Sequence, residues 1–331
     1  MSRSATILGG IAGTRLAPAE RDFFRSADPW GFILFARNVE NPDQLRRLTG
    51  DLREAVGRDA VVTVDQEGGR VQRLRAPHWR EWPAPLDQAE AGARAMWLRY
   101  RLIGAELRDA GIDSDCAPAL DVAQADTHPF LRNRCFGSDP ARVAELGRAA
   151  ADGLLAAGVL PIVKHMPGHG RAVADSHHDL PTVTASEEDL DALDFAPFRA
   201  LKDLPMGMTG HIRFAALDDA PATASARMVT IIRERIGFDG LLVTDDIGMN
   251  ALSGTEPERA AASIAAGCDL VLHCNGDIGM MEPVVAAAGS MSADAQRRAD
   301  AALAMRHPPE PADLDALMAE YRAMLPDSGV A

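Results

Sequence analysis

The chain of 331 residues is long for an ordinary domain, but α/β barrels reach this size as a single unit. A hydrophobic fraction of 47% beside 25% charged residues is typical of a soluble globular protein. The formal net charge of −14 argues against a nucleic acid or an anionic membrane as partner.

Signals for targeting and for disulfide formation are weak in this chain. The four cysteines form neither a CxxC pair nor a small-domain disulfide framework, which favours reduced thiols. The apolar run 5–12 follows Arg3 but is interrupted by glycines, so it fits a first strand better than a signal peptide. No stretch has the length of a membrane span. We therefore expect a cytoplasmic protein.

Eight short apolar runs, rich in β-branched residues, have the character of strands buried on both faces. In chain order these runs are 6–11, 31–35, 60–64, 114–120, 159–163, 206–209, 241–244 and 269–273. Helical patterns lie between most of them, and one begins at Asp139–Pro140 and stops at Gly158. This order predicts a (β/α)8 TIM barrel with C-terminal helices, a single domain over residues 1–331.

Polar or charged residues stand at or just past the C-terminal end of nearly every predicted strand. That end of a TIM barrel carries the active site, so the pattern predicts a functional site there. The residues are Arg37, Asn38, Asp65, Asp121, Lys164, His165, His211, Asp245 and Asn275.

The stretch 163–181 has an unusual density of titratable groups. It leaves a predicted strand and passes through Gly168 and Gly170, which permit backbone shapes that other residues resist. Catalytic groups concentrate on loops mounted on a rigid scaffold, whereas zinc ligands usually have a more compact spacing. A metal cluster and a plain solvated loop are the alternatives to a catalytic loop. The titratable residues are Lys164, His165, His169, Asp175, His177, His178 and Asp179.

Two further motifs place acids at strand ends. Asp65 is followed by a glycine turn and by Arg73, which predicts either a pair that binds a ligand or an internal ion pair that stabilises the turn. Asp245 and Asp246 end a buried strand, where neighbouring residues point to opposite faces. We expect one of these two acids to face a ligand and the other to cap the next turn or pair with a neighbour; a structural role for both is the alternative.

Four motifs in this order resemble the β-N-acetylhexosaminidases of glycoside hydrolase family 3, and the length resembles the short bacterial members. The resemblance covers about residues 31–250. Position 166 is more often Phe in the family, and positions 247–248 are more often Leu-Ser, which concerns fine specificity rather than the reaction. The motifs are Asp-Gln-Glu-Gly-Gly-Arg-Val-Gln-Arg at 65–73, Asn-Arg-Cys-Phe-Gly at 133–137, Lys-His-Met-Pro-Gly-His-Gly at 164–170 with Asp-Ser-His at 175–177, and Gly-Phe-Asp-Gly-Leu-Leu-Val-Thr-Asp-Asp at 237–246.

The resemblance implies an exo-acting, retaining β-N-acetylglucosaminidase that needs no metal or cofactor. Asp245 would be the nucleophile, His177 the proton donor and acceptor, and Asp175 the partner that orients His177. The expected substrate is a terminal N-acetylglucosamine (GlcNAc) of a muropeptide in cell-wall recycling. The implied substrate-binding residues are Asp65, Arg73, Arg134, Lys164 and His165.

The implied chemistry is consistent with elementary mechanism. A retaining glycosidase needs a carboxylate nucleophile on one face of the anomeric carbon and a proton donor on the other. Histidine can be cationic near neutral pH, and a partner carboxylate would stabilise the imidazolium. A glycoside phosphorylase or another β-glycosidase on the same barrel is an alternative. A metal-dependent hydrolase and an inactive sugar-binding barrel are alternatives from other classes.

Overall fold

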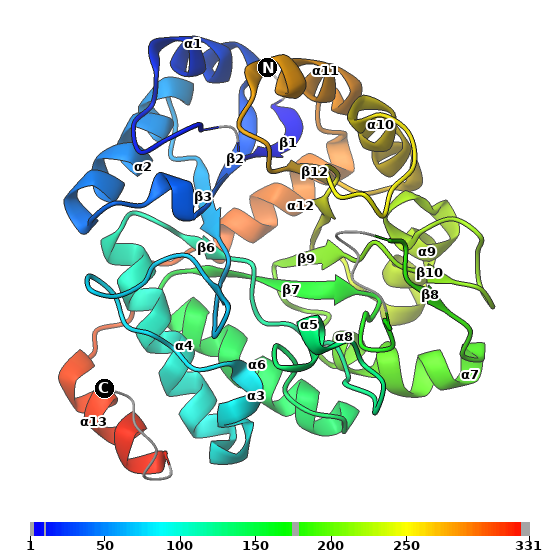
Figure 1. Ribbon diagram of the computed structural model, residues 1–331. Helices are drawn as coiled ribbons and strands as arrows, with labels where there is room; N and C mark the ends of the chain where they lie inside the picture. The colour runs from blue at the N-terminus through cyan, green and yellow to red at the C-terminus, as the bar shows by residue number, and fades with distance from the viewer. Residues whose placement is uncertain (1–2, 10, 174–178, 326–331) are drawn as a thin grey trace.

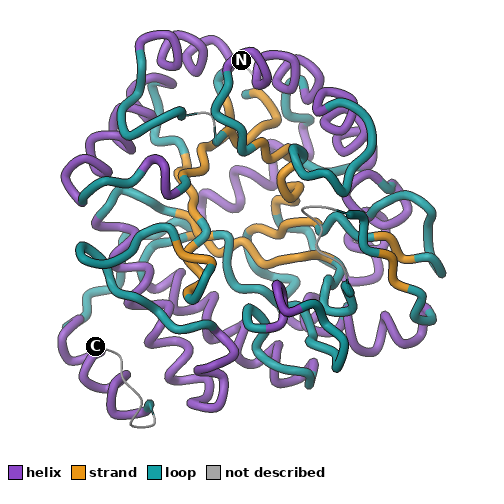
Figure 2. Tube along the Cα trace, viewed as in Figure 1, coloured by secondary structure: helices purple, strands orange, loops and turns teal. Residues whose placement is uncertain are grey.

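A closed barrel of parallel strands forms the centre of the computed structural model, which describes residues 3–9, 11–173 and 179–325. Around the barrel the strands follow the order β1, β12, β11, β9, β7, β6, β3 and β2, so the last strand closes on the first. Helices surround this ring of strands (Figures 1 and 2). The predicted TIM barrel is confirmed, whereas the assignment of the whole chain to one domain stays a prediction.

Each of the eight predicted apolar runs overlaps one barrel strand. The run 114–120 differs most, because only its first two residues form a regular strand. Pro118 has no N–H to donate, and beyond it the chain follows β7 through single hydrogen bonds, such as Leu120 N to Lys164 O at 2.6 Å. The strands are β1 (Ser4–Leu8), β2 (Pro29–Leu34), β3 (Val61–Val64), β6 (Ser114–Asp115), β7 (Leu160–Met166), β9 (Met206–Thr209), β11 (Leu241–Asp246) and β12 (Leu270–His273).

Most of the longer helices pack on the outside of the barrel, and α13 lies against α4 (Figure 1). Two short sheets, β4–β5 and β8–β10, lie outside the barrel ring. The helices are α1 (Pro18–Ala27), α2 (Pro42–Val56), α3 (Pro85–Gln88), α4 (Gly92–Asp109), α5 (Pro129–Arg132), α6 (Pro140–Ala156), α7 (Glu187–Asp189), α8 (Ala196–Ala200), α9 (Ala226–Thr230), α10 (Glu256–Ala266), α11 (Ile278–Ala288), α12 (Ala293–Ala304) and α13 (Leu314–Met324). The short strands are β4 (Gln66–Gly68), β5 (Val71–Gln72), β8 (Thr182–Val183) and β10 (Arg213–Phe214).

The helix predicted after Asp139 shows why the local sequence forms this element. The Asp139 side chain accepts a hydrogen bond from the Ala141 amide at 3.1 Å, and Pro140 occupies the first helical position. Gly158 follows the helix end with a φ of 74°, a left-handed conformation that glycine adopts without strain. The side chains of Val143, Leu146, Ala150 and Leu154 form its buried face.

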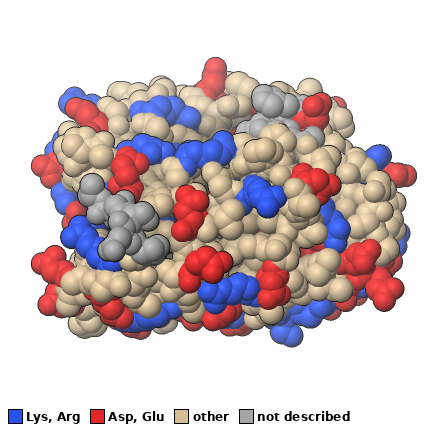
Figure 3. All heavy atoms as spheres, turned by 60° about the horizontal axis from the view of Figure 1, so that its bottom comes forward, with Lys and Arg blue, Asp and Glu red and all other residues tan. Residues whose placement is uncertain are grey.

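The surface in Figure 3 mixes charges of both signs rather than gathering one sign into a patch. Many of these charges pair, as Arg94 does with Glu320 at 2.7 Å and Arg297 with Asp239 at 2.8 Å. Throughout residues 3–9, 11–173 and 179–325, the helices lack the combination of length and hydropathy that crossing a bilayer requires.

Candidate active site

Strand periodicity explains which side chains point into the barrel mouth. On β7, Leu160 and Ile162 belong to one core cluster with residues of other barrel strands, such as Val61 and Val243, whereas Val163 belongs to another cluster with residues of α4 and α6. Since successive strand residues alternate between faces, Lys164 falls on the inward side with Ile162. The same alternation places Asp65 after β3 and Asp245 at the end of β11 on the inward face.

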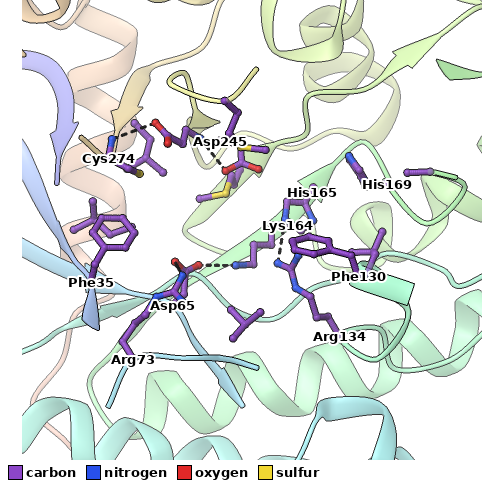
Figure 4. A pocket seen from close by; sticks show the side chains of 18 of the residues that line it. Phe35, Asp65, Arg73, Phe130, Arg134, Lys164, His165, His169, Asp245 and Cys274 are labelled. Carbon is purple, nitrogen blue, oxygen red and sulfur yellow. Dashed lines mark hydrogen bonds and ion pairs between the residues drawn. The ribbon is translucent and has the colours of Figure 1, made fainter. Parts of the chain in front are cut away.

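A pocket of about 170 Å³ opens where these inward residues end. This volume is below the range of about 300–1,000 Å³ typical of pockets for drug-sized ligands, so it suits one small polar molecule. Phe35 and Phe130 stand on opposite sides of Asp65 and Lys164 in Figure 4. The lining combines such apolar side chains with charged ones.

Five side chains of alternating charge form a continuous chain through the pocket floor. Arg73 Nη2 lies 3.0 Å from Asp65 Oδ2, and Asp65 Oδ1 lies 3.0 Å from Lys164 Nζ. Lys164 Nζ is also 2.6 Å from Glu67 Oε1, and Glu67 accepts two bonds from Arg134, at 2.8 and 2.9 Å. Asp65 and Arg73 thus form the ion pair of one interpretation, and both line the pocket, whereas their binding of a ligand stays a prediction.

The charges of these five side chains stabilise one another. Burial alone would raise the pKa of the Glu67 carboxyl, but Arg134 and Lys164 outweigh burial and lower that pKa to about 2. Asp65 is affected in the same way by Lys164 and Arg73, and its pKa is also lowered. Burial lowers and the carboxylates raise the pKa of Lys164, with a net increase, so the ammonium keeps its charge at neutral pH.

His165 links Arg134, the last of these five side chains, to another buried acid, Asp121. Its Nδ1 lies 2.7 Å from Asp121 Oδ2, and its Nε2 lies 3.4 Å from Arg134 Nη2 (Figure 4). The other Asp121 oxygen accepts the His169 amide at 2.7 Å. Because Arg134 can only donate, the geometry favours the tautomer of His165 with its proton on Nδ1, directed at Asp121.

Asp245 and Asp246 both line the pocket but have different partners. The Asp246 carboxylate accepts the amides of Gly248 at 3.0 Å and Cys274 at 3.1 Å, so it caps the following turn as expected for one of the two acids. The Asp245 carboxylate accepts the Asp246 amide at 2.8 Å. Burial would raise the pKa of Asp245, but His211, His165 and this amide lower it, which favours an ionised carboxylate.

The predicted site residues divide into two groups. Asp65, Arg73, Arg134, Lys164, His165 and Asp245 come together around the one pocket, although they arise from distant parts of the sequence. His177 and Asp175, like His178, lie outside the described residues, so their assigned roles stay predictions. Asp179 is described and is exposed.

Other polar residues at strand ends brace the backbone rather than line the pocket. Arg37 donates to the carbonyl of Cys274, and Asn38 donates to the carbonyls of Ile11 and Gly13. His211 Nε2 lies 2.8 Å from the Asp246 carbonyl, which supports the end of β11. These residues explain part of the strand-end polarity without a direct ligand role.

The motifs assigned no specific role to three residues that matter here, Glu67, Asp121 and His169. His169 lines the pocket, and burial lowers its pKa to about 4, so its imidazole is neutral near pH 7. Glu67 was detectable, because it stands two residues after Asp65 in the first motif. Within the described parts of the chain, no cluster of three or more His, Cys, Asp or Glu residues has a metal-binding arrangement.

A family model and individual known proteins are both similar to this chain. The family model described as "Glycosyl hydrolase family 3 N terminal domain" matches residues 19–303. The Beta-hexosaminidase of Bordetella avium (strain 197N) is 39% identical over 281 residues, which cover 81% of this chain and 80% of that protein.

Two solved structures are similar over almost the whole chain. A glycoside hydrolase family 3 beta-N-acetylglucosaminidase from Paenibacillus sp. str. FPU-7 matches with a TM-score of 0.82 and 32% identity. The match covers 99% of this chain but 63% of that larger one. NagZ from Neisseria gonorrhoeae, in complex with N-trifluoroacetyl-D-glucosamine, matches with a TM-score of 0.83 and 30% identity, over 98% and 96% of the two chains.

Proposed function

Because the chain belongs to glycosyl hydrolase family 3, we propose that it is an exo-acting, retaining β-N-acetylglucosaminidase that releases terminal GlcNAc. The observation that carries this proposal is the pocket itself. It places an ionised acid, Asp245, beside the charged chain from Arg73 to Arg134.

The pocket chemistry suits a sugar. Sugar hydroxyls both donate and accept hydrogen bonds, so carboxylates and cations side by side can satisfy each hydroxyl, and charge-assisted bonds are the stronger ones. The apolar faces of a pyranose can lie against Phe35 and Phe130. The small volume supports binding of a single terminal residue, with the remainder of the substrate outside the pocket.

The proposed reaction has two steps at the anomeric carbon. Asp245 attacks this carbon while His177 protonates the departing glycosidic oxygen, which gives a covalent glycosyl-enzyme. His177 then takes a proton from water, the water oxygen attacks the same carbon, and Asp245 is released. Two displacements retain the β configuration. Asp175 would stabilise the imidazolium that His177 must form in each cycle.

We propose a GlcNAc-containing muropeptide of cell-wall recycling as the substrate, and the cytoplasm as the site of action. The similarity to NagZ, which was solved with a glucosamine derivative, supports the sugar assignment. The excess of acidic residues and the reduced-thiol pattern are consistent with an intracellular enzyme that binds neither nucleic acid nor membrane.

The test is turnover of 4-nitrophenyl β-glycosides with GlcNAc or glucose as the sugar, each with and without phosphate. We expect hydrolysis of the GlcNAc glycoside, insensitive to chelators, with the β product seen first by NMR. Equal turnover of the glucoside would contradict the sugar assignment. Phosphate-dependent release of GlcNAc-1-phosphate would identify a phosphorylase, and an α product would contradict retention.

A further inference from the structure

We propose that Glu67 is a positioning residue, whose buried carboxylate holds the Lys164 ammonium and the Arg134 guanidinium in the arrangement that binds the sugar. This inference rests on the proposed function, because it assumes that Lys164 and Arg134 contact the substrate. Glu67 itself would not touch the sugar.

The contacts of Glu67 distinguish it from Asp65, its neighbour in the charged chain. The Asp65 side chain is 17% exposed and lines the pocket, whereas the Glu67 side chain is 0% exposed and is absent from the lining. The Glu67 carboxylate contacts two pocket cations: Lys164 at 2.6 Å, and Arg134 through both of its oxygens. Glu67 therefore acts from behind the residues that face the ligand.

A carboxylate is needed at this position for a physical reason. Lys164 and Arg134 are both buried cations on one pocket, and their charges repel. Glu67 Oε1 accepts from both of them, which screens this repulsion and fixes their separation. The two-point contact with Arg134 also fixes the plane of the guanidinium, because the fork of donors matches a carboxylate in one orientation.

The backbone at Glu67 is anchored by a residue of α4. Arg99 on α4 is buried and donates to the carbonyls of Glu67 at 2.7 Å and Pro83 at 2.6 Å. Gly68 makes room for this contact, since a Cβ there would collide with the Arg99 guanidinium. The Glu67 side chain thus starts from a fixed position, which a role in precise placement requires.

This anchor extends to the last helix of the described chain. Gln88 Oε1 accepts from Arg99 and from the hydroxyl of Tyr321 on α13. The relay from Tyr321 through Gln88 and Arg99 to Glu67 is buried along its length. It connects α13 to the pocket floor without contact between α13 and the pocket.

The test compares Glu67→Gln and Glu67→Asp with the wild-type enzyme on 4-nitrophenyl β-GlcNAc. Gln keeps the shape but removes the charge, and Asp keeps the charge but withdraws it by one methylene. We expect kcat/KM to fall about 10- to 100-fold for Gln, as lost charged hydrogen bonds typically do, and less for Asp. The affinity for free GlcNAc, measured by competition, should weaken by about tenfold in Glu67→Gln.

Asp113 provides the matched control. Its side chain is 1% exposed and pairs with Arg53 at 3.0 Å and Arg306 at 2.6 Å, just before β6 begins, at the barrel end opposite the pocket. Asp113→Asn should lower Tm as Glu67→Gln does, because each removes a buried negative charge that pairs with two cations. Its kcat/KM should stay within about twofold of wild type at a temperature well below Tm.

A cycle with Arg134→Met tests whether Glu67 acts through its partner. If it does, the loss of kcat/KM in the double variant is smaller, by about threefold or more, than the product of the two single losses. Losses that multiply would overturn the proposal. So would Glu67 variants that fold with native-like Tm and keep kcat/KM within twofold of wild type. If Glu67→Gln does not fold, Glu67→Asp takes its place in the comparison with wild type and in the cycle with Arg134→Met.

The outcomes for the two proposals are distinguishable. Wild-type enzyme that fails to cleave any β-GlcNAc contradicts the proposed function. The inference about Glu67 fails separately, when the wild type is active and the Glu67 variants are equally active.

Discussion

The backbone amide of Asp246 lies 2.8 Å from Oδ1 of Asp245, so the second acid of the pair holds the first through its main chain. The Asp246 carboxylate is engaged elsewhere, with the amides of Gly248 and Cys274. Asp245 keeps its second oxygen for the pocket, since no described residue is hydrogen-bonded to it. This division agrees with the proposed roles, in which Asp245 attacks the sugar and Asp246 fixes the turn.

We first predict that a 2-fluoro or 5-fluoro glycosyl inactivator labels Asp245. Asp245→Ala should lose nearly all turnover while it keeps the wild-type Tm within a few degrees. Mass spectrometry of the peptic peptide would locate the label. A label on Asp246 or Asp65 would contradict the assignment of the nucleophile.

The second prediction concerns Asp246→Asn. Both backbone amides donate to the same carboxylate oxygen, Oδ1, and an Asn amide oxygen can accept both bonds without the negative charge, so the turn after β11 should be weakened rather than lost. We expect a loss of about 1–2 kcal/mol in unfolding free energy, because two charged hydrogen bonds become neutral ones. Turnover should fall far less than in Asp245→Ala. Urea unfolding and steady-state kinetics on the same samples check both parts.

The third prediction addresses the acid/base group. His177→Ala should reduce turnover by about 10²- to 10⁴-fold on an aryl GlcNAc with a poor leaving group, and less on one with a good leaving group. Asp175→Ala should change activity in the same direction and shift the pH profile. Azide should restore part of the rate. His178→Ala is the control; if it alone loses activity on the poorer leaving group, the acid/base belongs to His178.

The fourth prediction concerns Lys164→Met, which leaves the carboxylates of Asp65 and Glu67 without the cation that they share. Breaking a buried pair in this way typically costs about 3–5 kcal/mol of stability. We expect a large drop in unfolding free energy together with an increase in KM. Arg94→Met removes one partner of the exposed Arg94–Glu320 pair and should change little, by the same unfolding assay.

The fifth prediction gives a sign for pH dependence at Asp115, which pairs on β6 with Val64 of β3. Burial raises the pKa of the Asp115 carboxyl to about 8. Its Oδ1 accepts the Gln66 amide at 2.9 Å, and its Oδ2 has no described partner. Since the folded pKa exceeds the unfolded value of about 3.9, the folded state binds more protons between these values. The unfolding free energy contributed by Asp115 therefore decreases as pH rises from about 4 to 8.

Asp115→Asn cannot lose a proton, so its stability relative to wild type should increase from pH 5 to pH 8. We expect its unfolding free energy to gain at least about 1 kcal/mol relative to wild type. One proton bound only in the folded state changes the unfolding free energy by about 1.4 kcal/mol per pH unit. Urea unfolding at the two pH values measures it. Asp239→Asn is the control, because Arg297 lowers the pKa of Asp239 to about 2, below the window. A constant difference for Asp115→Asn would contradict the raised pKa.

Local patterns in the sequence determined the barrel and the position of its site. A strand buried on both faces needs a continuous apolar run, so each barrel strand could be found by itself, and the polar residue at its end could be found with it. The runs 6–11 and 114–120 extend furthest past their strands, which end at Leu8 and Asp115, and an apolar composition does not reveal that Pro118 interrupts the ladder of the second. The motifs added the family and the roles expected for Asp245 and the substrate-binding residues.

The tertiary structure alone decided which of these side chains meet. Lys164 and Asp65 are 99 residues apart in the chain, and Arg134 and Glu67 are 67 apart, yet both pairs lie within 3.0 Å. No local pattern encodes such pairs, since ion pairing depends on the closure of the barrel and on the burial that closure produces. The same physical reason explains why the motifs assigned no role to Glu67 and Asp121. Their importance comes from partners distant in the sequence, such as Arg134 for Glu67 and His165 for Asp121, and it exists only when the barrel has closed.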